Sequence, residues 1–221
     1  MSSINILALD TSSNCCSVAL QYNGIIKQIF ASAIERSEKI LIIIEKLLNN
    51  MPINELSALA FAAGPGSLTG LKIASSIIQA LHLVYKKPII KISTLQALAL
   101  LAMEKFNTEL VIPCMDAKMG QIYYGVYKRD ANIPCLIPQA MQPDSLGYPE
   151  EILKLSHKAL LIGSGTPLLE KQLQLNSNTI EIAPTLIDPN AEAIVKLADY
   201  CYKKYGIISN NADPIYLRSY Y

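Results

Sequence analysis

Arginine, histidine and tryptophan are scarce in this chain of 221 residues. It holds three arginines (Arg36, Arg129 and Arg218), two histidines and no tryptophan. Nineteen basic residues face eighteen acidic ones, so the formal net charge is only +1. A protein that grips nucleic acid by itself carries a basic patch that neutralises phosphates. The composition argues against such a patch, and any nucleic acid should be held mostly by another subunit.

The cysteines are odd in number and show no Cys-x-x-Cys spacing. There are five of them, at Cys15, Cys16, Cys114, Cys135 and Cys201. This usage fits reduced thiols better than a disulfide framework or a zinc site.

The sequence also lacks the usual pattern of a membrane-spanning or leader segment. No uninterrupted apolar run is long enough to cross a bilayer, and the first residues lead into a strand pattern without a basic leader. We therefore expect a soluble, cytoplasmic protein without membrane contact.

What is present is an internal repeat. Each half begins with an apolar strand that ends at an aspartate, Ile4–Leu9 before Asp10 and Leu110–Met115 before Asp116. A turn, a hairpin, a strand, a helix and another strand follow in both halves, and Asn23-Gly24 is a strong hairpin signal in the first. In the second half, the pattern places a strand near 133–137 and a helix over 144–155.

The repeat predicts an α/β fold of two lobes, each with a βββαβα order. We expect an N-terminal lobe over 1–106 and a C-terminal lobe over 107–221, with a last helix near 190–205 that is free to pack back on the first lobe. This describes the actin-like, Hsp70-ATPase and sugar-kinase class (ASKHA, related to RNase H), in which a nucleotide sits between the lobes. Ligands of open α/β sheets collect at the carboxyl ends of the strands.

Two readings stay open for the matched aspartates and for a glycine pair. Asp10 and Asp116 could contact a Mg²⁺–nucleotide, since Mg²⁺ prefers carboxylate and phosphate oxygens. Each could equally cap its own turn. Gly163 and Gly165 lie where adenosine-binding glycines of this fold would be, and a plain turn explains them as well.

A glycine-rich loop precedes a helix expected over 69–85. Its motif residues are Gly64, Pro65, Gly66, Ser67, Thr69 and Gly70. Such loops can cradle an anion at a helix N-terminus, but Leu71-Lys72 after Gly70 does not fit a Walker A motif. A nucleophilic Ser67 has little support, because no histidine is near in sequence. The default interpretation is a tight strand-to-helix turn that Ser67 or Thr69 caps.

Several segments together resemble the TsaB family, also called YeaZ. They follow the family's order over nearly the whole chain. These segments are Asp10-Thr11-Ser12, the Gly64–Gly70 loop with the following Leu71-Lys72-Ile73, Ser93-Thr94-Leu95, Asp116 to Tyr123, and Tyr216-Leu217-Arg218.

The resemblance implies a non-catalytic subunit of the complex that adds threonylcarbamoyl to N6 of the adenosine 3′ of the anticodon, in tRNAs that read codons beginning with A. Its partners would be TsaD, a paralogue that carries the metal and catalyses transfer, and the ATPase TsaE. A homodimer is possible when the chain is alone, and tRNA is reached only through the complex. No cofactor or metal is intrinsic, and ATP or ADP with Mg²⁺ enters only in the complex. The only histidines, His82 and His157, form no His-x-x-x-His pair, which is typical of TsaB and not of TsaD.

A partner surface is expected on two helices. On a helical wheel, one arc of the first helix is apolar and should face the core, whereas Ile42 falls among polar residues on the other side. The core-facing arc consists of Ile40, Leu41, Ile43, Ile44, Leu47 and Leu48. The helix from Thr69 presents small polar residues outward. The resemblance implies that these helices pair with those of TsaD or of a second copy, through Arg36, Ile42, Glu45, Ser75, Ser76 and Gln79.

The chain departs from the family at this surface. The family often has histidine where Arg36 stands and proline where Ile42 stands, and the loop usually has phenylalanine in place of Leu68. Two other functions have less support in the sequence. An autonomous ATP-dependent, kinase-like enzyme lacks a candidate base here, and a glycoprotease lacks a metal pair or triad.

Overall fold

The computed structural model describes residues 4–32, 36–130, 137–154, 158–170, 180–206 and 208–218. The chain divides into two compact units, 1–94 with 189–215, and 95–188 with 216–221. Cys135, His157 and nearly all of the strand expected near 133–137 lie outside the described residues.

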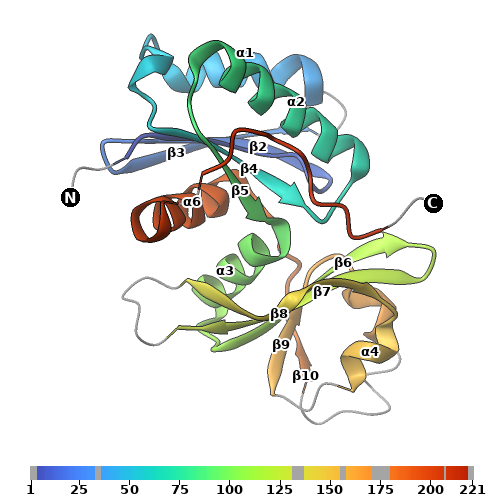
Figure 1. Cartoon of the computed structure of the whole chain (residues 1–221). Helices are drawn as coiled ribbons and strands as arrows, with labels where there is room; N and C mark the ends of the chain where they lie inside the picture. The colour runs from blue at the N-terminus through green and yellow to red at the C-terminus, as the bar shows by residue number, and fades with distance from the viewer. Residues whose placement is uncertain are drawn as a thin grey trace. The chain divides into compact units, whose positions relative to one another are not determined.

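The first unit is built on a five-stranded mixed sheet in the order β3-β2-β1-β4-β5 (Figure 1). β1, β4 and β5 run parallel, and the β2–β3 hairpin adds antiparallel strands at one edge. Every residue of β1 and β4 is buried, because helices cover both faces of these central strands. The strands are β1 (Ile6–Asp10), β2 (Cys15–Tyr22), β3 (Ile25–Ser32), β4 (Ala58–Gly64) and β5 (Ile89–Ser93).

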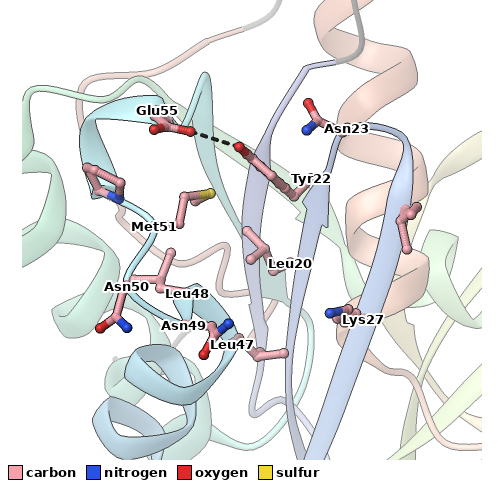
Figure 2. A pocket seen from close by; sticks show the side chains of 12 residues that line it. Leu20, Tyr22, Asn23, Lys27, Leu47, Leu48, Asn49, Asn50, Met51 and Glu55 are labelled. Atoms are coloured by element: carbon pink, nitrogen blue, oxygen red, sulfur yellow. Dashed lines mark hydrogen bonds between the residues drawn. The ribbon is translucent and has the colours of Figure 1, made fainter.

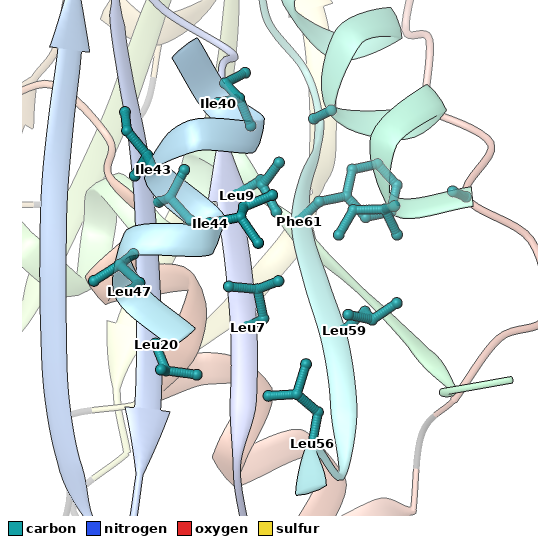
Figure 3. Close-up of a cluster of buried hydrophobic side chains, with 14 of the residues drawn as sticks. Leu7, Leu9, Leu20, Ile40, Ile43, Ile44, Leu47, Leu56, Leu59 and Phe61 are labelled. Carbon is teal, nitrogen blue, oxygen red and sulfur yellow. The ribbon is translucent and has the colours of Figure 1, made fainter. Parts of the chain in front are cut away.

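Two helices, α1 (Arg36–Leu48) and α2 (Leu68–Tyr85), cover one face of this sheet, and α6 (Ala191–Tyr205) covers the other (Figure 1). A short η2 (Ile53–Glu55) leads from α1 into β4. Figure 3 shows Ile44 of α1 near Leu9 of β1, and Leu47 of α1 toward β2, near Leu20. Burial of each such side chain contributes about 1.5–3 kcal/mol, and this packing rather than local propensity holds α1 in place.

α6 joins the N-terminal sheet although it comes late in the chain. Asn190 caps it by accepting a hydrogen bond from the Ala193 amide over 3.0 Å. The amide of Ala191 donates to Ser17 Oγ, and that of Glu192 donates to Gln28 Oε1, both over 2.8 Å. The orphan amides of the first turn are therefore satisfied by side chains of β2 and β3. The last helix packs on the first sheet, as the sequence had left possible.

The second unit repeats the plan. Its five strands follow the order β10-β9-β6-β7-β8, which matches the first sheet strand for strand and confirms the duplicated α/β organisation. The strands are β6 (Leu110–Lys118), β7 (Gln121–Arg129), β8 (Pro138–Gly147), β9 (Ala159–Ile162) and β10 (Ile180–Ile182), and the helical segments are α3 (Thr94–Phe106), α4 (Pro149–Leu153) and η3 (Thr166–Leu168).

The prediction of a helix over 144–155 was wrong for the first residues of that range. β8 continues to Gly147, where it pairs with Ile122, and α4 is only five residues long. Ladder pairing with β7 outweighs the weak helical preference of this stretch. The division of the chain also differs from the one expected at 106, because Leu98 and Met103 of α3 lie in the core cluster of the second unit.

α2 is long and apolar enough to cross a membrane by length and composition alone. A search for uninterrupted apolar runs overlooks it, because serines, glycine and glutamine interrupt the helix. Its buried residues are only Gly70, Leu71, Ala74 and Ile78. α2 packs one stripe on the sheet of a folded unit, and most of its remaining surface is not covered by the described part of the chain.

Candidate functional site

The glycine-rich loop is a junction between three segments of the first unit. Ser67 caps α2 by accepting a hydrogen bond from the Gly70 amide over 3.4 Å, which confirms the cap that the sequence predicted. The Ser67 amide donates to the carbonyl oxygen of Ser12 over 2.8 Å. A Cβ added to Gly66 would lie 2.5 Å from that same oxygen. Glycine is needed there because the loop touches the turn that follows β1.

Gly64, at the end of β4, is held by the C-terminal segment. Its φ is +124°, and an added Cβ would lie 2.5 Å from the Ile215 carbonyl oxygen. The Ile215 amide donates to the carbonyl of Ala63 over 2.7 Å, and Thr11 Oγ1 donates to the carbonyl of Gly70 over 2.6 Å. The backbone around these glycines is thus in contact with the turn after β1 and with the C-terminal segment of the same chain. A role in anion binding stays a prediction.

Asp10 is fully buried and organises the turn after β1. Its Oδ1 accepts hydrogen bonds from the amide of Ser12 over 2.8 Å and from the Ser12 hydroxyl over 2.6 Å. This is the geometry of an Asx-type turn, which is one of the two roles that the sequence suggested. A Mg²⁺–nucleotide contact by Asp10 stays a prediction.

Asp116 has the equivalent place in the second unit and makes equivalent contacts. Its Oδ1 accepts from the Lys118 amide over 2.7 Å, and its Oδ2 pairs with Lys118 Nζ over 2.8 Å. Partial burial raises the pKa of Asp116, but the hydrogen bonds and charge of Lys118 lower it, and the resulting pKa lies below its usual value. Asp116 is therefore an ionised carboxylate that caps the β6–β7 turn.

The glycine pair of the second unit lies against the same strand. Gly163 has a φ of +115°, and an added Cβ would overlap the Cys114 carbonyl oxygen. The Gly165 amide donates to that oxygen over 3.1 Å, and Ser164 Oγ accepts from the Asp116 amide over 3.2 Å. The structure thus brings the predicted Gly163–Gly165 turn and Asp116 together, which the sequence did not indicate. Adenosine binding by these glycines stays a prediction.

Arg218 links two of the family-like segments and was not singled out as a site residue. Its Nη2 donates to Gln121 Oε1 over 2.7 Å and to the Ala117 carbonyl over 3.0 Å, and its Nη1 lies 3.1 Å from Met119 Sδ. The guanidinium therefore holds both sides of the β6–β7 turn. Only the recurrence of Tyr216-Leu217-Arg218 beside the other motifs could have drawn attention to it.

The expected partner surface on α1 is more apolar than the helical wheel suggested. Ile42 is 62% exposed, as predicted, and Glu45 is exposed beside it. Leu41 is 58% exposed, so its assignment to the core was wrong. It stands at the rim of the apolar arc, where the sheet no longer covers the helix. The side chain of Arg36 lies outside the described part of the structure.

On α2, Ser76 is exposed and Ser75 is half-buried. Both side chains are small, so they protrude little from this face of the helix. Gln79 is already engaged, because its Oε1 accepts a hydrogen bond from the Ala212 amide over 2.8 Å. Gln79 thus fastens the C-terminal segment to α2. The participation of Ser75, Ser76 and Gln79 in a partner contact stays a prediction.

Metal binding and thiol catalysis have little support among the described side chains. Within that part of the chain, no three His, Cys, Asp or Glu residues come together as a metal site would require. Cys114 is buried, and burial raises the pKa of its thiol far above the usual value. This thiol is part of the core and is poorly suited to nucleophilic chemistry.

Comparisons with known proteins find TsaB proteins and the family model of their paralogue TsaD. Residues 14–202 match the family described as TsaD, tRNA N6-adenosine threonylcarbamoyltransferase. The chain is 32% identical to the tRNA threonylcarbamoyladenosine biosynthesis protein TsaB of Haemophilus influenzae, over 99% of this chain and 95% of that one. It is 35% identical to TsaB of Buchnera aphidicola from Schizaphis graminum, over 86% and 90%.

A solved structure of the same family, also called YeaZ, is similar to the chain. YeaZ from Pseudomonas aeruginosa superimposes with a TM-score of 0.84 at 25% identity, over 97% of this chain and all of that one. Sequence and structure thus match the same relatives over nearly the full length of both chains, and we conclude that the chain belongs to the TsaB family of tRNA threonylcarbamoyladenosine biosynthesis proteins.

Proposed function

We propose that the chain is a non-catalytic subunit of a tRNA N6-adenosine threonylcarbamoyltransferase complex. It would pair with a TsaD-like subunit, with TsaE joining, and would make that complex competent to modify the adenosine 3′ of the anticodon. The name of its relatives, tRNA threonylcarbamoyladenosine biosynthesis protein TsaB, supports a role in this modification pathway. The match to the TsaD family over residues 14–202 supports a pairing of paralogues with similar folds.

The observation that carries the pairing is the surface of α1. Leu41 and Ile42 are adjacent, both more than half exposed, and they lie on a helix whose opposite side is anchored in the core. A contiguous exposed apolar patch is the usual mark of an interaction surface. On α2, the neighbouring helix on the same face of the sheet (Figure 1), the small side chains of Ser75 and Ser76 would let a partner helix approach closely. In the absence of the TsaD-like subunit, a second copy could occupy the same face.

The non-catalytic assignment rests on the sequence. Two histidines 75 positions apart cannot form the helix-borne pair of a metal site, and no candidate base accompanies Ser67. ATP or ADP with Mg²⁺ would then belong to the complex and not to this chain. The low arginine content and the net charge of +1 assign the main tRNA contacts to other subunits. A cytoplasmic location follows from this role.

The test is depletion of the chain in its own cell, followed by nucleoside mass spectrometry of bulk tRNA. Threonylcarbamoyladenosine should fall and should return when the wild-type chain is restored. An unchanged level after depletion would refute the function. As a second arm, the purified chain alone should not turn over ATP above a buffer blank, and turnover that Asp10→Ala abolishes would favour a kinase-like enzyme instead.

A further inference from the structure

The four outer edges of the two sheets are protected to different degrees. β5 is covered at Ile89, which exchanges two hydrogen bonds with Ser209 over 2.9 and 2.7 Å. β10 is only three residues long. β8 contains Pro138 and Pro143, and its pairing with β7 is interrupted by two register shifts. Short strands, prolines and bulges are the usual means of blocking a sheet edge.

β3 has none of these protections. Its eight residues pair with β2 in one uninterrupted register, and it contains no proline. Among the described residues, no strand pairs with its outer edge. Ile25 is 65% exposed and Phe30 is 59% exposed. Lys27, also exposed, is the one charged residue of β3. A long, regular free edge that exposes apolar side chains is a template for an added strand, and a single lysine leaves it open to an acidic one.

Two hollows lie beside this edge, on the face that α1 covers. The first has a volume of about 570 Å³, and its floor is apolar (Figure 2). The floor is formed by Leu20, Leu47, Leu48 and Met51. At one end Tyr22 donates its hydroxyl to Glu55 over 3.0 Å. This volume is large enough for a bulky apolar side chain.

The second hollow, of about 440 Å³, adjoins the first and shares Lys27, Leu47 and Asn49 with it. Lys46 is its second cation. Both lysines are exposed, and within the described part of the chain neither forms an ion pair. The second hollow therefore suits a carboxylate.

The spacing of the hollows fits an extended peptide. Side chains that point to one face of a strand recur every second residue, about 6.6–6.8 Å apart. Ile25 and Lys27, two residues apart on β3, both line the first hollow, and Lys27 lines the second as well. An added strand would thus present one side chain to each hollow while its backbone pairs with β3.

We infer that the outer edge of β3 is a docking site for an extended segment of a partner protein, which adds as a strand and places an apolar and an acidic side chain, two residues apart, in these hollows. An antiparallel strand, the commoner arrangement, would carry the acidic residue on the N-terminal side. The site is separate from the Leu41–Ile42 surface on α1 and does not depend on it.

The probe is a heptapeptide amide of sequence Val-Glu-Val-Leu-Val-Thr-Val that carries fluorescein on its N-terminus. It is titrated into the full chain and followed by fluorescence anisotropy. Two further peptides carry N-methyl groups on one or the other alternating set of amides. Saturable binding is expected, and methylation of only one set should abolish it, because alternate amides of an edge-paired strand face the neighbour.

Variants test the two hollows separately. Ile25→Asp and Lys27→Glu should each weaken binding by at least about tenfold, and a probe with lysine in place of glutamate should recover affinity for Lys27→Glu. Leu186→Asp is the matched control, because Leu186 is 62% exposed, close to the exposure of Ile25, but belongs to the second unit. It should leave peptide binding unchanged, and thermal melting should show that all three variants remain folded.

Three outcomes would overturn the inference. They are absence of saturable binding to the unmodified probe, equal binding of both methylated peptides, and full affinity of the Lys27→Glu variant. If the probe fails while the chain forms dimers that Ile25→Asp dissociates in sedimentation, the edge pairs with a second copy and the peptide site is refuted. None of these results bears on the tRNA modification measured after depletion, so the two proposals fail independently.

Discussion

Arg218 Nη2 donates a hydrogen bond to Gln121 Oε1 over 2.7 Å, across 97 positions of sequence. The same nitrogen reaches the carbonyl of Ala117 on the other side of the β6–β7 turn. Nη1 of the same guanidinium lies 3.1 Å from Met119 Sδ, so two nitrogens of this planar group reach three neighbours at once, which the single nitrogen of a shorter lysine side chain cannot do. The end of the described chain is therefore part of the second unit's turn.

We expect Arg218→Lys to loosen this turn almost as much as Arg218→Ala. Amide hydrogen exchange over 116–121 should quicken in both variants, and the free energy of unfolding should fall by about 1–3 kcal/mol, since hydrogen bonds to a charged group are lost. Arg129→Lys is the control, because the Arg129 guanidinium donates to Asn107 Oδ1 over 3.0 Å, away from the β6–β7 turn. Normal exchange in Arg218→Lys would show that charge alone suffices.

Replacement of Gly66 should cause a steric clash. Gly66→Ala would place a Cβ 2.5 Å from the Ser12 carbonyl oxygen, and the two backbones would have to separate. We expect a loss of about 1–3 kcal/mol in urea unfolding. Gly120→Ala is the comparison, because its Cβ would meet open space and only its left-handed φ of +74° adds a cost, of about 1–2 kcal/mol. A Gly66→Ala variant as stable as the parent would mean that the loop shifts freely.

Asp10 tests the turn-capping role. Asp10→Ala leaves the buried amide and hydroxyl of Ser12 without their acceptor, so the free energy of unfolding should fall by about 1–3 kcal/mol. Asp10→Asn keeps an amide oxygen at that position and should lose less. Equilibrium denaturation of both variants makes the comparison. Equal stability of Asp10→Ala and the parent would indicate that Asp10 is kept for something other than its turn.

Asp116 should show its lowered pKa in a ¹³C NMR titration of its carboxyl, and Lys118→Met should raise that pKa toward the usual value. Because the pKa is lower in the folded state, the interaction stabilises the chain above the unfolded pKa, and this stabilisation is lost as pH falls through the folded pKa. The contribution is below about 1 kcal/mol, since Lys118 is mostly exposed. An unchanged pKa in Lys118→Met would assign the shift to another group.

Ile42→Glu tests the proposed partner surface. The side chain is solvated in the free chain, so the melting temperature should stay near that of the parent. Assembly with the cognate TsaD-like subunit should weaken by a few kcal/mol, roughly the cost of burying an unpaired charge, as measured by size-exclusion chromatography and calorimetry. Ile25→Glu, equally exposed but on β3, should assemble normally. Undiminished assembly of Ile42→Glu would place the partner surface elsewhere.

Local patterns in the sequence determined much of the molecule. The repeat that starts at Ile4 and Leu110 predicted two similar α/β lobes, since apolar periodicity and turn residues act over short distances. The corresponding strand orders of the two sheets agree with it. A cap of α2 by Ser67 or Thr69, of which the structure uses Ser67, and the exposure of Ile42 followed in the same way. The motif segments also identified the family before any fold was known.

Tertiary structure alone decided the rest, because it depends on contacts between distant residues. Whether Leu41 at the rim of its arc is covered depends on where the sheet ends, and the stretch from Asp144 became strand because β7 offered it a ladder. The contacts of Gly66 with Ser12 and of Arg218 with Gln121 have no local signature. The free edge of β3 is likewise a property of the assembled sheet, since a strand is an edge only by virtue of what does not pair with it.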